Sequence, residues 1–531
     1  MHLATFTLRC CLPQAHPPCP QRTSCQRQSR GWRSPLGMRT RLHSRVQPFT
    51  RVWLAAICRM HPLGIRTRLR SRALPFTRVR LAHVWCLYAF IQFVLLTLAV
   101  PSWSDSRNVT ALPNLILISL DSARPDHLSL YGYPLSTSPN LDNWASRALV
   151  FDHARTVVPL TGPSHASVFT SLYPHQHGAF RNGVPLKERW HTLAKILSDR
   201  GYHTAAFISG WTLRSTISGL NRGFLEYDDD LSSRYKLLNR ERVAEDTVAA
   251  VLDFLGQKPF EAPFFLFVHF FDPHDPYRRH AGIVQVLENQ ARRLGLPKDI
   301  SVLNYDNELA YLDLHLGKLL ETCQRRGMLE NTLVMIFSDH GESLGEHGYR
   351  GHGRRIYEQC VRIPMLLYAP QLFPQARRVA TPVTTLDILP TMLSLMGIPL
   401  PAGIAVAGRD LAGHLLTGEP MPARPLYSET FKGTLKRFTR FFARGVPSKP
   451  SYMGCLSGTL KFILKPDASI LEVYDLAADP DEQRNLACGK SYSEVSTQLA
   501  SWYEERLERE PIRASLTTEE TQQLRSLGYL E

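Results

Sequence analysis

Acidic residues and lysine are missing from the first 83 residues of this 531-residue chain. That stretch carries 16 arginines, and the first acid in the sequence is Asp105. Removing those arginines from the 62 basic residues of the chain leaves 46 against 47 acidic residues, so the rest of the protein is almost neutral. Basic clusters bind nucleic-acid phosphates. The basic end could serve as a nucleic-acid arm, but we favour the interpretation given next and do not expect a nucleic-acid partner.

The arginine-rich segment also lacks the periodicity of helices and strands. It contains two copies of one stretch, PLGMRTRLHSRVQPFTRVWLA from Pro35 and PLGIRTRLRSRALPFTRVRLA from Pro62. Two copies are too few to stack into the core of a repeat protein. We interpret residues 1–83 as a low-complexity segment. It is either disordered or not part of the working protein, because the start codon was assigned too far upstream.

Cysteine spacing gives no sign of a metal site or of a disulfide framework. Six of the ten cysteines lie at or before Cys86, and the other four are scattered over the body of the chain. Those four are Cys323, Cys360, Cys455 and Cys488. No C-x-x-C pair occurs among them, so neither a thiolate metal site nor a disulfide pairing can be derived.

Charge is absent from the run VWCLYAFIQFVLLTLAV, residues 84–100. Its 17 residues place it between the core of a signal peptide and a short membrane span. The arginines before it keep the N-terminal side in the cytoplasm. We assign residues 84–104 to a signal peptide or a membrane anchor rather than to a buried helix. The expected protein is exported, periplasmic or extracellular, and an uncleaved run would anchor it by one N-terminal helix.

From Pro113 onward, short apolar runs alternate with segments of helical pattern. The runs are nearly continuous, as in strands that are buried on both faces of a parallel sheet. They span residues 114–122, 203–210, 262–274, 331–342 and 363–370. The helical segments span 138–148, 191–199, 242–256 and 304–326. This alternation predicts an α/β fold with a mostly parallel sheet.

Polar side chains follow three of the predicted strands. They are Asp121, Asp272, His274, Asp339 and His340. A single Asp after a strand is usually a helix cap. Capping is a weaker explanation when three strands of one chain all end in this way. Because ligands of open α/β sheets bind at the carboxyl ends of the strands, we expect these side chains to converge there. Clustered carboxylates repel one another, and two Asp, a His and a hydroxyl suit a divalent metal that neutralises them.

The hydroxyl is supplied by VVPLTGPSHASVFTSLYPHQHG, residues 157–178. PSHASVFTSL is typical of a helix start, with Pro163 in the first turn and Ser164 as a candidate cap. Thr161 and Gly162 are then expected just before a helix N-terminus, which favours anions. A metal on the Thr161 oxygen would lower its pKa and make it a nucleophile. A plain turn explains TGPS alone, and only the combination with the strand ends indicates a site.

Two histidines in polar loops are candidates for proton transfer. HFFDPHDPY places His274 two residues after Asp272, and SDHGESLGEHGYRGHGRRIYE carries His352 in a glycine-rich loop. We predict that His274 and His352 donate protons or contact an oxyanion. Arg354 is a candidate for holding a substrate anion, although a solvated loop arginine explains it equally well.

The chain from about Pro113 to its end resembles the sulfatase family of the alkaline phosphatase superfamily. The stretches that carry the resemblance occur in the family's order. They are LDSARPDHLSLYGY, TGPSHASVFTSLYPHQHG, FVHFFDPHDPY, SDHGESLGEHG with GHGRRIYE, and EVYDLAADPDEQRNLA. The resemblance implies an alkaline-phosphatase-like catalytic domain over residues 112–395 and a smaller C-terminal α+β subdomain over 396–531.

The same resemblance implies a catalytic site. The implied metal ligands are Asp121, Thr161, Asp339 and His340. The implied catalytic residues are Thr161, His274 and His352, and we assign further substrate contacts to His165, Asn182 and Arg354. In-line attack by Thr161 on a sulfate or phosphate ester would form a covalent intermediate, which water then releases.

Three departures separate the chain from typical sulfatases. The family carries Cys or Ser in a C/S-x-P-S-R motif, which is converted to formylglycine; this chain has Thr161, so formylglycine is not expected. Ser122 replaces a second Asp, and His340 replaces a frequent Asn. This set looks more like the phosphate-handling branch of the superfamily. We therefore favour a phosphate ester over a sulfate ester and one divalent ion, which could be Ca, Mn, Mg or Zn.

The sequence thus predicts an exported, metal-dependent hydrolase of a small-molecule, lipid or glycan ester. One alternative is a transferase of phospho head groups. It would need an acceptor site and usually several membrane spans, whereas this chain offers at most one. The other alternative is a non-catalytic, anion-binding relative, which the intact Thr161 and its three neighbours disfavour.

Overall fold

The computed structural model describes residues 112–504, apart from 232–240, 258–262, 298, 432–449, 466–469 and 488–491, together with the isolated residue 522. The arginine-rich segment and the apolar run 84–100 lie outside the described residues, so the predictions made for them are untested. Within the described part, no helix combines the length and hydropathy that crossing a lipid bilayer requires.

The centre of the larger domain, residues 112–417, is an eight-stranded sheet with the order β12-β2-β11-β7-β1-β6-β4-β5. Its strands are β1 (Asn114–Leu120), β2 (Leu149–Phe151), β4 (His203–Phe207), β5 (Glu226–Asp228), β6 (Phe264–Phe270), β7 (Thr332–Ser338), β11 (Met365–Tyr368) and β12 (Arg377–Val379). Only β11 runs antiparallel to its two neighbours, and the other pairs are parallel. The predicted α/β fold with a mostly parallel sheet is therefore confirmed.

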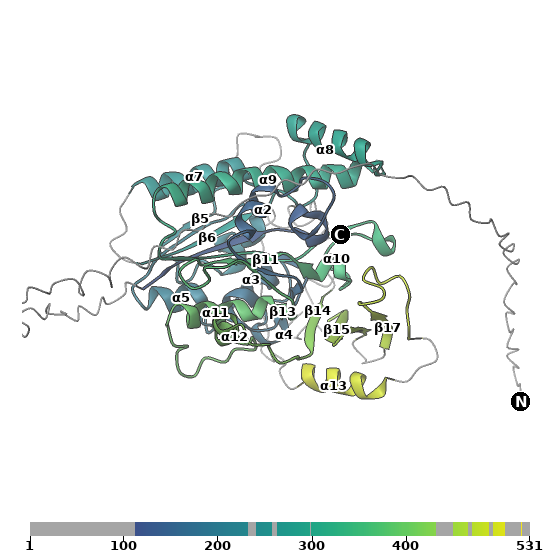
Figure 1. The fold of residues 1–531 in the computed structure, drawn as a ribbon. Helices are drawn as coiled ribbons and strands as arrows, with labels where there is room; N and C mark the ends of the chain where they lie inside the picture. Colours follow the sequence, from purple (N-terminus) through teal and green to yellow (C-terminus); the bar gives the residue numbers. More distant parts are fainter. Residues whose placement is uncertain are drawn as a thin grey trace, which may run out of the picture. The chain divides into compact units, whose positions relative to one another are not determined.

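Helices cover both faces of this sheet (Figure 1). One face carries α2 (Pro139–Ala145), α7 (Ala244–Gln257) and α9 (Ile300–Arg325), with α8 (Ala281–Leu294) packed on α9. The other face carries α3 (Thr161–Thr170), α5 (Leu193–Ser198), α11 (Ile388–Leu395) and α12 (Ala412–Thr417). Because side chains alternate along a strand, Leu115 and Leu117 enter one core while Ile116 and Ile118 enter the other.

Short elements connect these layers. They are β3 (Ala154–Arg155), β10 (Arg362–Ile363) and β13 (Val383–Thr384), which pair in one small sheet; β8 (Ser343–Leu344) and β9 (Arg350–Gly351), which pair in another; and the helices α4 (Pro174–His177), α6 (Ser215–Ser218) and α10 (Glu358–Val361).

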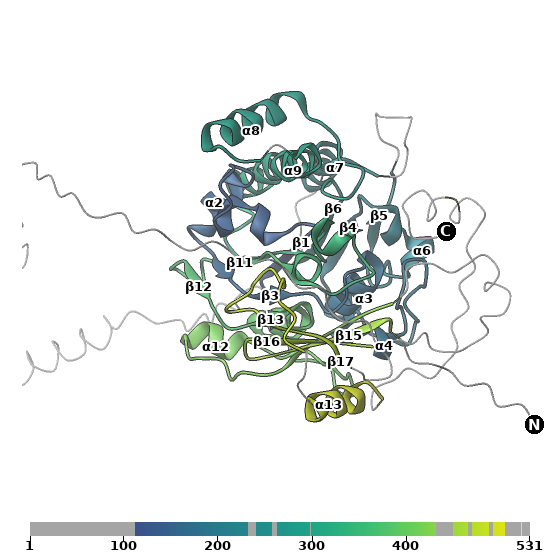
Figure 2. The same ribbon diagram turned by 90° about the vertical axis from the view of Figure 1, so that its right-hand side faces the viewer.

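A smaller antiparallel sheet forms the C-terminal subdomain, as predicted. It contains β14 (Leu426–Thr430), β15 (Tyr452–Ser457), β16 (Leu460–Leu464) and β17 (Ile470–Asp475), with α13 (Ser493–Glu504) beside it (Figure 2). One apolar cluster contains residues of this sheet, such as Met453 and Phe462, together with Val157, Leu160 and Trp211 of the larger domain. The subdomain therefore packs against the loop that precedes α3.

Helix α3 begins two residues earlier than the sequence indicated. Its first residue is Thr161 and its N-cap is Leu160, whose side chain makes no capping hydrogen bond. The prediction that Thr161 precedes the helix and that Ser164 caps it was wrong. The Ser164 hydroxyl instead donates to the main-chain carbonyl of Asp339 at 2.8 Å, a tertiary contact that local sequence does not reveal.

Candidate metal and nucleophile site

Two adjacent strands of the central sheet end side by side and deliver the polar residues of the site. Leu120, the last residue of β1, pairs with Ser338, the last residue of β7. The next residue along each chain segment is Asp121 or Asp339, and His340 follows. The parallel sheet thus brings together side chains that are remote in sequence, as the strand-end rule predicts.

Asp121, Asp339 and His340 form a compact and fully buried cluster. One ligand atom from each of the three lies within 4.8 Å of the others. His340 Nε2 is 3.3 Å from Asp339 Oδ2 and 4.0 Å from Asp121 Oδ1. The Thr161 hydroxyl joins them, because its Oγ1 lies 3.3 Å from the same His340 nitrogen. Four donor atoms of the kinds predicted from sequence therefore converge.

The two carboxylates are electrostatically unequal. Burial raises the pKa of Asp339 far above its usual range, and the nearby charge of Asp121 raises it further. Burial also acts to raise the pKa of Asp121, but the hydrogen bond from His269 and the other nearby histidines outweigh burial and lower it. Two buried carboxylates this close repel each other when both are ionised, and a cation or a proton relieves that repulsion.

The donor set fits a divalent cation. Asp339 Oδ2 is buried and accepts no hydrogen bond from the described residues, which leaves a desolvated carboxyl oxygen to be satisfied. His340 Nδ1 donates to the carbonyl of Gly341 at 3.0 Å, so Nε2 keeps its lone pair on the side of the carboxylates. Burial holds the pKa of His340 well below its usual value, and the ring is therefore neutral. Two carboxylates, an imidazole and a hydroxyl would hold such an ion.

Several supporting residues were not found from the sequence. His269 on β6 donates from Nε2 to Asp121 Oδ2 at 3.3 Å. The hydroxyl of Ser122 donates to Asp121 Oδ1 at 2.8 Å, and Tyr305 of α9 donates to the Ser122 carbonyl at 2.8 Å. The available sign was His269 itself, a polar residue inside an otherwise apolar strand. The Tyr305 contact has no local sequence signature.

His274 and His352 lie beside the cluster. The ring centroids of His352 and His340 are 4.2 Å apart, and those of His352 and His274 are 5.0 Å apart. His352 Nδ1 is 3.3 Å from both carboxylate oxygens of Glu342, a buried residue that the sequence analysis did not single out. Burial alone would lower the pKa of His352, but the Glu342 carboxylate raises it above its ordinary value.

The three predicted substrate contacts have different surroundings. His165 is fully buried: its Nδ1 donates to the Thr161 carbonyl at 2.7 Å, and its Nε2 accepts from Ser119 at 2.9 Å. Asn182 Oδ1 accepts from the Gly162 N–H at 2.8 Å, while its buried Nδ2 has no partner among the described residues. Arg354 is exposed. The Asn182 amide can still donate to a ligand, whereas both ring nitrogens of His165 are used in hydrogen bonds that link α3 to β1.

Other residues of the same motifs lie elsewhere. Asp272 follows β6 but accepts the Ala244 N–H at the start of α7 at 2.8 Å, so it acts as a helix cap. His175 pairs with Glu429 of the C-terminal sheet at 2.8 Å. His177 accepts from the Ala179 N–H at 3.0 Å and contacts the Ser167 hydroxyl at 3.1 Å. These contacts are structural.

Comparisons with known proteins agree with this architecture. The family model described as Sulfatase matches residues 113–398, and one described as N-sulphoglucosamine sulphohydrolase, C-terminal, matches residues 345–509. The uncharacterized sulfatase YidJ of Escherichia coli (strain K12) is 26% identical over 454 residues, covering 73% of this chain and 85% of the relative. N-acetylglucosamine-6-O-sulfatase of Bacteroides thetaiotaomicron is 23% identical over 512 residues, covering 78% and 90%.

Solved structures share the fold. Phosphonate monoester hydrolase of Agrobacterium radiobacter superposes with a TM-score of 0.56 and 22% identity, covering 74% of this chain and 95% of the other. At that identity the likeness concerns the fold alone. The family match and the curated relatives place the protein among the ester hydrolases of the sulfatase type. The chain belongs to the sulfatase family, as the sequence motifs predicted.

Proposed function

We propose that this protein is a metal-dependent ester hydrolase in which Thr161 is the nucleophile and Asp121, Asp339 and His340 hold one divalent cation. The observation that carries the proposal is that Thr161, Asp339 and Asp121 converge at 3.3 to 4.0 Å from His340 Nε2. The unpartnered and buried Asp339 Oδ2 adds a reason for a cation to be there. When bound, a divalent cation would lower the pKa of the hydroxyl and offset charge on the ester.

The residues of the chain then have distinct tasks. Thr161 Oγ1 forms a bond to the phosphorus or sulfur atom while the bond to the ester oxygen breaks. The Thr161 proton passes to solvent as the bond forms, and the departing alcohol gains a proton from His352 or His274. That histidine recovers a proton from the water that attacks next, and the released Thr161 oxygen takes a proton back from solvent. Water next attacks the same phosphorus or sulfur atom, restores the Thr161 hydroxyl and releases the inorganic anion. The Asn182 amide, whose buried Nδ2 has no partner among the described residues, would stabilise a non-bridging oxygen.

A phosphate ester is favoured over a sulfate ester. The nucleophile is an unmodified threonine rather than a residue that can become formylglycine, and an imidazole stands in the metal set. Both features resemble the phosphate-handling branch of the superfamily. The substrate would be a glycan, lipid or other small-molecule ester. The relative from Bacteroides thetaiotaomicron carries the name of a glycan sulfatase, which supports a sugar as the alcohol part.

Paired assays test the reaction. Aryl sulfates and aryl phosphate mono- and diesters should be compared in the presence of Ca, Mn, Mg or Zn. Thr161→Ala should lower kcat by at least about 1000-fold, since it removes the nucleophile. Thr170→Ala is the matched control, because Thr170 is a buried threonine of the same helix whose hydroxyl bonds only to the Ala166 carbonyl at 2.6 Å. Full activity of Thr161→Ala would refute the nucleophile, and turnover of sulfate esters alone would refute the phosphate preference.

Export is proposed from the sequence of residues 84–104 alone. Cell fractionation of the full chain and of a form that begins at Val84 tests it. Both forms should leave the cytoplasm if the apolar run directs export, and the segment 1–83 should be dispensable. Retention of both forms in the cytoplasm would refute the proposal.

A further inference from the structure

The loop that carries His352 is attached to the C-terminal sheet. The hydroxyl of Thr430, the last residue of β14, donates to the Gly353 carbonyl at 2.7 Å. Thr430 is fully buried, and Gly353 directly follows His352. A residue of the small subdomain therefore fixes the peptide group next to a predicted proton donor.

The same loop lies directly against the residue before the nucleophile. Gly353 has φ +79°, and a Cβ built on it would lie 2.6 Å from Leu160 Cδ2. Leu160 precedes Thr161, so the position of the Gly353 peptide and the position of the nucleophile depend on each other. Glu429, the neighbour of Thr430, donates its N–H to the Val157 carbonyl at 2.9 Å. Two consecutive residues of β14 thus contact both loops of the site.

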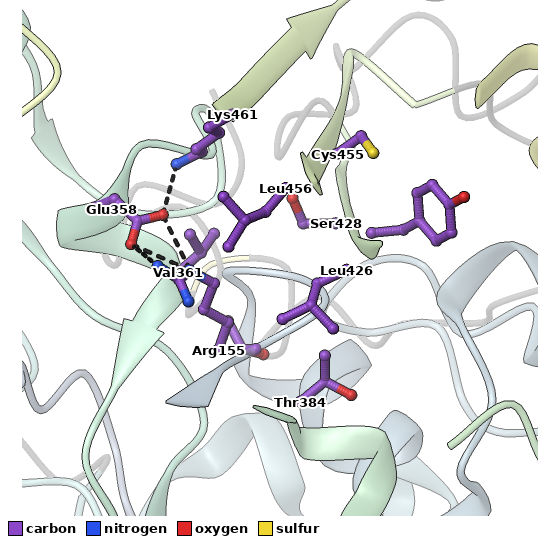
Figure 3. Close-up of a pocket in the computed structure, with 11 residues that line it drawn as sticks. Arg155, Glu358, Val361, Thr384, Leu426, Ser428, Cys455, Leu456 and Lys461 are labelled. Carbon is purple, nitrogen blue, oxygen red and sulfur yellow. Dashed lines mark hydrogen bonds and ion pairs between the residues drawn. The ribbon is translucent and has the colours of Figure 1, made fainter. Parts of the chain in front are cut away.

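The far end of the His352 loop is fixed separately. Glu358 accepts hydrogen bonds from Arg155 at 2.7 Å and from Lys461 of β16 at 3.0 Å, as the close-up shows (Figure 3). Ile356 joins an apolar cluster with Ile463. These contacts determine where the segment ends, but they lie several residues beyond His352. Glu342 contacts the His352 ring itself, Ser343 pairs with Gly351 before it, and Thr430 holds the Gly353 carbonyl after it.

We propose that Thr430 is a positioning residue of the catalytic site, which acts by holding the Gly353 carbonyl so that His352 faces the ester beside Thr161. The inference rests on the proposed function of His352. It gives the C-terminal subdomain a catalytic task in addition to its packing. A group held this way is sensitive to displacements of about 1 Å, which can cost about 100-fold in rate.

Two substitutions separate positioning from folding. Thr430→Val keeps the shape of the buried side chain and removes only the donor, whereas Thr430→Ser keeps the donor and removes a methyl group. Tyr474→Phe is the control, because it removes a hydrogen bond to Glu472 that stays within the same sheet. The readouts are kcat and KM on phenyl and nitrophenyl esters of the preferred acid, the Tm, and the Kd of the activating cation.

We expect Thr430→Val to lower kcat on the phenyl ester by about 10-fold or more. KM and the cation Kd should stay near the wild-type values, and Tm should fall by no more than the few degrees that one unsatisfied buried carbonyl costs. The loss should be smaller on the nitrophenyl ester, whose leaving group needs little protonation. Thr430→Ser should restore kcat, and Tyr474→Phe should match the wild type.

Failure of this inference is distinguishable from failure of the proposed function. Thr161→Ala and His352→Ala are measured in the same assay. If both lose activity while Thr430→Val keeps the wild-type kcat, the positioning role of Thr430 is refuted alone. If His352→Ala is fully active, the role of His352 and this inference are both refuted. A loss in Thr430→Val that follows a lowered Tm and that Ser does not restore refutes positioning as well.

Discussion

Asp339 Oδ2 lies 3.3 Å from His340 Nε2, yet it accepts no hydrogen bond from the part of the chain that the structure describes. An oxygen of this kind raises the free energy of the cation-free protein and favours the cation-bound one. Replacing Asp339 should therefore affect stability in opposite directions with and without the cation.

Asp339→Asn should remove the stabilisation by divalent cations. With the cation at about 100 times its Kd, the wild type should gain about 2.7 kcal/mol, which is a rise of several degrees in Tm. In excess chelator, the variant should be at least as stable as the wild type, because it lacks one of two repelling carboxylates. Thermal unfolding with and without metal measures both effects. Asp152→Asn, which affects the surface pair with Arg378, is the control, and an equal Tm shift in Asp339→Asn and the wild type would contradict the site.

Gly353→Ala should inactivate the enzyme while the matched Gly348→Ala does not. Both glycines have positive φ, +79° and +67°, so both substitutions carry a backbone cost of about 1–2 kcal/mol. Only the Cβ at 353 would meet Leu160 Cδ2, at 2.6 Å, whereas the Cβ at 348 would meet nothing within 4 Å. A kcat loss of about 10-fold or more at position 353 alone is expected. Equal activities of the two variants would show that the contact with Leu160 does not matter.

Glu429→Ala should destabilise the protein strongly. The Glu429 carboxylate accepts from the His175 N–H at 2.9 Å and pairs with His175 Nδ1 at 2.8 Å, and both side chains are fully buried. Removing one partner of a buried pair costs about 3–5 kcal/mol. Asp199→Ala breaks the half-exposed pair with Lys195 and should cost about 0–1 kcal/mol. Urea unfolding gives both values, and a cost below about 1 kcal/mol for Glu429→Ala would argue against the pair.

Asp313 should make stability fall as pH rises from about 4 to about 6. Burial raises the pKa of this carboxyl to about 6, although hydrogen bonds from Asn140 and Leu141 oppose the shift. Because the folded pKa lies above the ordinary value of 3.8, the contribution is complete below about pH 4 and is lost as pH rises through 6. Its full size is about 3 kcal/mol.

Asp313→Asn has no proton to lose at this position. The free energy of unfolding of the wild type, taken relative to the variant, should therefore decrease between pH 4 and pH 7. Urea titrations at pH 4, 5, 6 and 7 measure this difference, in which the effects of all other groups cancel. A difference that is constant with pH would contradict the shifted pKa.

The convergence of the four candidate residues was predictable from the sequence because they obey local rules. Asp121, Asp339 and His340 each follow a continuous apolar run, and the edge where parallel strands end is fixed by the fold class. Thr161 stands before a proline-containing helix pattern. These signals need only strand and helix periodicity, and the structure brings all four side chains together.

The supporting residues were not predictable, because their roles come from contacts across the chain. His165 was assigned to substrate, but it stands four residues after Thr161 on a buried helix, and this spacing turns it toward the Thr161 carbonyl. Asp272 matched the strand-end pattern, but it caps α7, so for this residue helix capping is the explanation. Thr430 belongs to a strand of another sheet, and no periodicity links it to His352.

Every residue of α3 from Pro163 to Thr170 is buried, as is Thr161 at its start. A helix embedded in this way has no freedom to follow a bound molecule. Any change of substrate over evolution must then come from the surrounding loops, while the helix stays as it is. Relatives that act on different alcohols could thus keep this helix in the same place and differ in the loops around it.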